Sequence, residues 1–158
     1  MRKYLFNKIH NIMKNNRNIY VLTADLGYYL LDDIKKDYPN NFYNLGSSEQ
    51  LLIGTGTGLA LSNKIPICYS ITPFLLCRPF ETIRIYLNNE KIPVKMIGSG
   101  RGKDYLKDGF THWSDDDEKI INIFNNIEVF KPSTTKEIDE KLEYYLFNEN
   151  PVFISVSK

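Results

Sequence analysis

The sequence predicts an α/β protein of three layers, in which helices cover both faces of a mostly parallel sheet of roughly six strands. Two observations carry this prediction: short apolar segments alternate with helical segments, and most of the apolar segments lack period-two alternation. Such continuous apolar strands are typical of parallel sheets buried on both faces. Because the 158 residues are 42% hydrophobic, we assign residues 1–158 to a single domain.

The first half of the chain carries clear element boundaries. Apolar residues on one face of residues 2–14 predict a helix, and Pro39 ends the second helix. Gly54, Gly56 and Gly58 each weaken the third helix by about 1 kcal/mol, which suggests that another backbone or a flat ligand comes close. The expected elements are helices over Arg2–Lys14, Tyr28–Asp37 and Glu49–Ser62, and strands over Ile19–Thr23, Phe42–Leu45 and Ile65–Tyr69.

The second half continues the alternation. A helix over Leu75–Asn88 follows the turn at Ser70–Phe74, and a glycine-rich loop runs from Gly98 to Trp113. We expect Ser114 to cap the next helix, with three aspartates in its first turn. The remaining elements are strands over Val94–Ile97, Glu128–Phe130 and Val152–Val156, and a helix over Thr135–Phe147.

Composition excludes several classes of function. The net charge of +1 implies no strong attraction to nucleic acid or to a membrane surface. Cys68 and Cys77 form neither a disulfide framework nor a metal motif, and we interpret both as buried thiols. The basic N-terminus lacks the apolar run of a signal peptide, so we expect a cytoplasmic protein. The G-T-G-T-G run does not fit a dinucleotide-binding fingerprint.

Glu49 stands at a turn from strand to helix, and Phe74 lies in the turn after the next strand. Both turns follow carboxyl ends of strands, where open α/β sheets place their ligands. On position alone, Glu49 is equally a helix-start residue that serves the dipole, and Phe74 a core residue.

Several segments together resemble the pyrimidine-binding domain of the transketolase family of thiamine-diphosphate enzymes. They are G-S-S-E-Q around Glu49, G-L-A-L-S-N-K-I-P, P-F-L-L-C-R-P-F-E-T-I-R and D-G-F-T-H at residues 108–112. The resemblance implies that Glu49 hydrogen-bonds a ring nitrogen of the aminopyrimidine and must be protonated or share a proton, which an apolar site would favour. The cofactor's exocyclic nitrogen then removes the thiazolium proton.

The same resemblance assigns further roles. Phe74 would stack on the aminopyrimidine, with Leu75 or Thr72 as alternatives in register. His112 would face the reacting end of the substrate, and Asp108 would contact a substrate hydroxyl. Asp25 would either lie near the cofactor or cap the next turn. Lys131 stands where relatives place a basic residue near a substrate phosphate, but it can equally be a solvated lysine. Arg78 and Arg84 can be surface or interface residues, and we assign them no catalytic role.

Departures from the family pattern limit what the resemblance implies. The glycine-rich loop has no early histidine, and Trp113 replaces a polar residue, so phosphosugar recognition does not carry over. The sequence contains no Gly-Asp-Gly of the diphosphate-binding half. We therefore expect thiamine diphosphate to be shared with a partner subunit that holds the diphosphate and Mg²⁺, in a homodimer or an α2β2 assembly.

The sequence thus favours the pyrimidine-binding subunit of a split transketolase, which moves a two-carbon ketol unit from a ketose to an aldehyde, both small sugars or sugar phosphates. Alternatives are the small subunit of a 2-oxoacid dehydrogenase or a deoxyxylulose-phosphate-synthase-like enzyme. D-G-F-T-H favours transketolase among these. A rival of another class is a non-catalytic, protein-binding domain of this fold, against which Glu49 argues.

Overall fold

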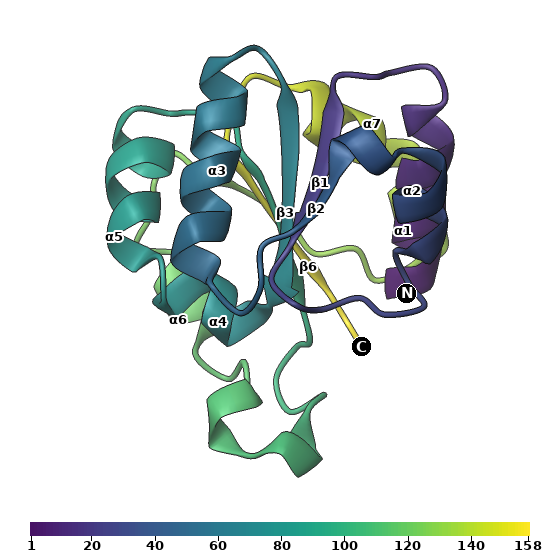
Figure 1. Cartoon of the computed structure of the whole chain (residues 1–158). Helices are drawn as coiled ribbons and strands as arrows, with labels where there is room; N and C mark the ends of the chain where they lie inside the picture. The colour runs from purple at the N-terminus through teal and green to yellow at the C-terminus, as the bar shows by residue number, and fades with distance from the viewer.

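The computed structural model describes residues 1–158 and has one six-stranded sheet at its centre (Figure 1). Its strands are β1 (Ile19–Thr23), β2 (Phe42–Asn44), β3 (Ile65–Ile71), β4 (Lys95–Ser99), β5 (Glu128–Phe130) and β6 (Val152–Val156). The strand order is β2-β1-β3-β4-β6-β5, and every neighbouring pair is parallel. The predicted fold class is therefore confirmed.

Helices cover both faces of the sheet (Figure 1). One face carries α1 (Arg2–Met13), α2 (Asp32–Asp37) and α7 (Thr135–Phe147); the other carries α3 (Glu49–Leu61), α4 (Thr72–Cys77), α5 (Phe80–Thr82) with a π-helical continuation over Ile83–Asn89, and α6 (Asp117–Ile121). Single 3-10 turns lie at Pro39–Asn41, Leu106–Asp108 and Phe110–His112. Each face has its own apolar core, of 19 and 17 buried residues, so burial of both faces accounts for the continuous apolar strands.

Two of the predicted helices differ from the structure. The segment from Tyr28 does not become helical until Asp32, because Gly27 and Tyr29 have φ angles of 94° and 62°, outside the helical region. The helix expected over Leu75–Asn88 instead begins at Thr72 and is interrupted before Phe80. Pro79 explains the interruption, since it has no N–H to continue the helical ladder.

The segment around Ser114 also corrects the sequence prediction. Helix α6 begins only at Asp117, and the Ser114 hydroxyl donates to the Gly100 carbonyl instead of capping a helix. Strand β4 extends through Ser99, so the loop begins later than predicted. Cys68 is buried as expected, but Cys77 is exposed, because α4 turns that position away from the core.

The glycines of α3 do not share one role. A Cβ at Gly56 would lie 2.6 Å from the Sγ of Cys68, so the helix approaches β3 closely there. At Gly54 and Gly58 a Cβ would meet nothing within 4 Å. The expected close approach is therefore correct within this chain for Gly56 only.

The strand order reverses direction between β1 and β3. The chain leaves β1 toward β2 on one side, then returns through α3 to β3 on the other side. Adjacent crossovers that diverge in this way leave a crevice at the carboxyl ends of the strands. The loop over residues 100–114 projects from this same edge of the sheet (Figure 1). None of the helices combines the length and the apolar composition that a membrane span requires.

Candidate functional site

Glu49 is a buried carboxylate at the beginning of α3, and only 2% of the residue is exposed. Gly46, with a φ angle of 70°, turns the chain between β2 and this helix. The Glu49 Oε1 accepts a hydrogen bond from the Ser70 hydroxyl on β3 over 2.8 Å. Its Oε2 lies 2.6 Å from the Nη1 of Arg78. The apolar environment expected around Glu49 is therefore not present in the chain alone, because Arg78 forms an ion pair with the carboxylate.

Phe74 and Arg78 lie one helical turn apart and face the same way, as residues spaced by four on a helix do. The central carbon of the Arg78 guanidinium lies 3.8 Å from the centre of the Phe74 ring. Among the three candidates for the stacking position, Leu75 and Thr72 are fully buried and Thr72 donates to the Gly100 carbonyl. Phe74 is the only one of the three that is partly exposed, and its ring lines the hollow described below.

Asp25 lies at the rim of the same hollow. A volume of about 160 Å³ is lined by Asp25, Glu49, Ser70, Phe74 and Arg78, among others. The Asp25 carboxylate accepts from the hydroxyl of Tyr28 over 2.7 Å, and this bond lowers the pKa of Asp25. Asp25 therefore binds the Tyr28 side chain in the following turn and does not cap that turn through a backbone N–H. It also lines the hollow.

His112 approaches the site from the projecting loop. Its ring contacts the Phe74 ring edge to face, with 4.8 Å between the ring centres. The Nδ1 of His112 lies 3.0 Å from the Thr111 hydroxyl. A second cavity, of about 580 Å³, is lined by Phe74, His112 and Trp113 together with Phe110 and residues of α6. The structure thus brings His112 to Phe74, and through Phe74 to Glu49.

Asp108 is not brought to these side chains. It is exposed, its carboxylate makes no hydrogen bond, and it lines neither of the two cavities. Its role as a substrate contact stays a prediction.

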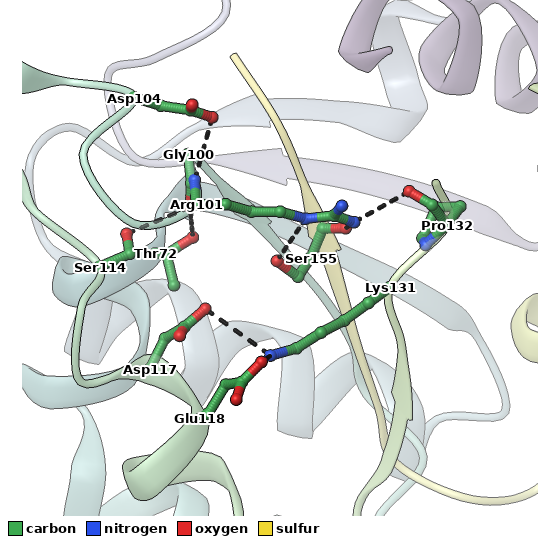
Figure 2. Close-up of polar contacts among 10 residues, drawn as sticks. All are labelled: Thr72, Gly100, Arg101, Asp104, Ser114, Asp117, Glu118, Lys131, Pro132 and Ser155. Atoms are coloured by element: carbon green, nitrogen blue, oxygen red, sulfur yellow. Dashed lines mark hydrogen bonds and ion pairs between the residues drawn. The ribbon is translucent and has the colours of Figure 1, made fainter. Parts of the chain in front are cut away.

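Polar contacts fix both ends of the loop that carries His112 (Figure 2). The Gly100 carbonyl accepts from the hydroxyls of Thr72, over 2.8 Å, and Ser114, over 3.1 Å. Arg101 donates to the carbonyl oxygens of Ser155 and Pro132, which ties the start of the loop to the end of β6. The base of the loop is therefore rigidly attached to the sheet, which limits where His112 can lie.

Lys131 is already engaged by acidic residues beside this loop (Figure 2). Its Nζ lies 2.9 Å from Glu118 and 4.0 Å from Asp117. Burial raises the pKa of Asp117, and the charge of Lys131 opposes that rise. Lys131 is a partly buried ion-pair member and neither a solvated lysine nor a free cation. No group of three or more His, Cys, Asp or Glu side chains is placed to hold a metal ion.

Sequence reasoning missed the two residues that contact the Glu49 carboxylate. Ser70 and Arg78 are distant from Glu49 in sequence and meet it only through the fold. One signal for Arg78 was present, because its spacing of four from Phe74 places both side chains on one face of α4. For Ser70 the sequence carries no such signal.

Three comparisons relate the chain to known proteins. The family model described as "Transketolase, pyrimidine binding domain" matches residues 1–158. An apulose-4-phosphate transketolase subunit of Actinobacillus succinogenes is 33% identical over 119 residues, covering 75% of this chain and 38% of that protein. The protein of the same name from Phocaeicola vulgatus is 25% identical over 158 residues, covering 99% of this chain and 51% of that protein.

A solved structure is also similar throughout. It is described as "Split gene transketolase, inactive beta4 tetramer", superposes with a TM-score of 0.85 at 27% identity, and covers 99% of this chain and 50% of that chain. The present chain thus spans about half or less of the length of these relatives. The match over all 158 residues shows that the chain belongs to the transketolase pyrimidine-binding domain family.

Proposed function

We propose that this chain is the pyrimidine-binding subunit of a split, thiamine-diphosphate-dependent transketolase, which transfers a two-carbon ketol unit from a ketose to an aldehyde. The observation that carries the proposal is the placement of the buried Glu49 carboxylate beside Phe74 at the point where the strand order reverses. Family membership supports the cofactor class. When bound, thiamine diphosphate supplies a nucleophilic carbon for attack on the ketose carbonyl.

The residues present fit an aminopyrimidine. Such a ring needs an aromatic surface on one face and a carboxyl group in its own plane that can share a proton with a ring nitrogen. Phe74 offers the surface and Glu49 the carboxyl group. The Arg78 guanidinium, which is also planar and carries N–H donors, makes both contacts in the free chain, and this supports a site with room for a flat donor.

His112 serves the substrate in this proposal. Its ring lies against Phe74 and lines the larger cavity, into which the carbonyl end of a bound ketose would extend. From there an imidazole can hold or transfer a proton at the substrate carbonyl oxygen. The ties at Gly100 and Ser114 reduce the freedom of the loop and so help to keep His112 within reach.

A second subunit would complete the site. The sequence has no Gly-Asp-Gly, so the diphosphate and Mg²⁺ would be held by a partner chain. Relatives that are named as separate transketolase subunits support a split arrangement. The cofactor would then lie between unlike domains, in an α2β2 assembly or a homodimer of such units, with a small sugar or sugar phosphate as substrate.

The test is Glu49→Gln in the assembly with its partner subunit, under saturating cofactor. The amide preserves the shape of the side chain but cannot share the acidic proton, so hydrogen–deuterium exchange at the thiazolium C2 should slow by about 10²–10⁴-fold. Cofactor affinity should change less, since the diphosphate contacts remain.

Glu81→Gln is the matched control, because Glu81 is an exposed glutamate on the neighbouring α5. It should leave exchange unchanged. Wild-type exchange in Glu49→Gln would remove Glu49 from the mechanism. Absence of both exchange and ketol transfer in the wild-type assembly would defeat the proposal and favour a non-catalytic, protein-binding domain.

A further inference from the structure

The Arg78 guanidinium fills the space between Phe74 and Glu49 in the free chain. It lies over the Phe74 ring at 3.8 Å and reaches the Glu49 Oε2 at 2.6 Å. These are the two contacts that the proposed function requires of an aminopyrimidine: stacking on Phe74 and an N–H directed at Glu49. A ring that stacks on this face cannot share the volume with the guanidinium.

We propose that Arg78 is a placeholder for the cofactor's pyrimidine ring, a positioning residue that must swing out before the ring can bind. This inference rests on the proposed function of the same site. Glu49 is buried, so in the absence of ligand its charge needs a partner within the protein. Arg78 provides that partner and keeps the carboxylate oriented toward the hollow.

The arginine is free to leave. Its side chain is 45% exposed, and Glu49 is its only hydrogen-bond partner. It follows the last residue of α4, and its backbone N–H donates to the Phe74 carbonyl. The side chain takes no part in that bond, so it can move while the helix end stays in place. Once outside, the guanidinium is solvated, whereas Glu49 would stay buried with the Ser70 hydroxyl but without a charged partner.

Departure of Arg78 is therefore coupled to arrival of a replacement. A neutral apolar ring could stack on Phe74 but would leave Glu49 uncompensated. An aminopyrimidine supplies both the stacking surface and the polar contact, so it can displace the arginine where a plain aromatic ring cannot. The exchange makes Arg78 a determinant of which flat ligand enters the hollow.

The test uses the whole free chain and the isolated pyrimidine half of the cofactor, 4-amino-5-hydroxymethyl-2-methylpyrimidine. Binding is followed by NMR at the Ser70 and Phe74 signals. Arg78→Met, which keeps the length but removes the plane and the charge, should bind this pyrimidine about tenfold more tightly than wild type. Arg78→Lys keeps a charge for Glu49 but cannot stack, so it should fall between the two and also guards against misfolding of the Met variant.

Arg84→Met is the matched control, since Arg84 is an exposed arginine of the next helical segment and should leave binding as in wild type. Weaker binding in Arg78→Met would show that Arg78 holds the ring, and would overturn the inference. Equal binding in all variants, or none in any, would also overturn it. None of these results decides the proposed function, which is tested separately by thiazolium exchange and ketol transfer in the assembly.

Discussion

Glu49 and Lys95 are both buried ionisable residues, 2% and 1% exposed, and they lie at opposite ends of the parallel strands. Lys95 begins β4, and its Nζ donates to the carbonyl and side-chain oxygens of Asn148 and to the carbonyl of Asn150, over 2.6–2.8 Å. Glu49 instead depends on Ser70 and on the half-exposed Arg78.

The difference separates a charge fixed within the fold from a charge whose partner can leave. The partners of Lys95 all belong to the single turn between α7 and β6, so its contacts close that turn onto the sheet. One partner of Glu49, by contrast, is the long side chain of Arg78, which can move into solvent. A buried charge whose partner can leave is a candidate ligand site.

The largest expected effect is the loss of stability when Lys95, the charge fixed within the fold, is replaced. Lys95→Met should lower the free energy of unfolding by about 3 kcal/mol, because three oxygen acceptors lose their donor at once. Glu49→Gln should change it by less than about 1 kcal/mol, because the amide oxygen can accept from Arg78 while the amide N–H donates to the Ser70 hydroxyl oxygen. Urea unfolding of the free chain measures both.

Lys141→Met controls for loss of a lysine, because Lys141 is exposed on α7 and should be neutral. A Glu49→Gln variant as damaged as Lys95→Met would refute the distinction between the two charges.

The pH dependence of stability sharpens the comparison. Burial lowers the pKa of Lys95 from 10.5 to about 8, and the nearby Glu128 opposes this shift. Between these two values the unfolded chain holds a proton that the folded chain has released, so stability rises with pH from about 8 to 10.5. The gain is on the order of 3 kcal/mol, because each pKa unit between the two values is worth about 1.4 kcal/mol.

Unfolding of wild type and Lys95→Met, compared at pH 7.5 and at several values up to about pH 10, isolates this lysine from other groups that titrate there. The stability of wild type relative to the variant should increase through the window. A constant difference would mean that Lys95 keeps its charge throughout.

Elements with local signals could be predicted from the sequence. The start of α7 follows from Thr134, whose hydroxyl accepts from the Glu137 N–H, and β1 and β6 follow from their apolar runs. The predicted start of α2 was wrong because the left-handed conformation of Tyr29 has no signature in a tyrosine.

The candidate site divides along the same line. Glu49, Phe74 and His112 lie in motifs that resemble the family and occur in its order along the chain. The fold brings these residues together. The contact between Arg78 and Glu49 joins residues 29 apart, and it exists only because α3 and α4 begin at the same edge of the sheet. No local pattern encodes such a pairing.

The smallest effect concerns two glycines on the helix that begins at Glu49. Gly58→Ala should raise the free energy of unfolding of the free chain by about 0.5–1 kcal/mol, because alanine favours a helix and its Cβ meets nothing within 4 Å. Gly56→Ala is the counterpart two residues earlier: its Cβ would lie 2.6 Å from the Sγ of Cys68, so it should destabilise. Both are measured by thermal and urea unfolding.

Gly58, like the Glu49 carboxylate, is then a feature that contacts within this chain do not explain. A partner subunit that packs closely against α3 would explain the absence of a side chain there. Gly58→Ala that stabilises the free chain but weakens assembly with the second subunit would place that partner against α3, whereas unchanged assembly would leave this face of the helix in solvent.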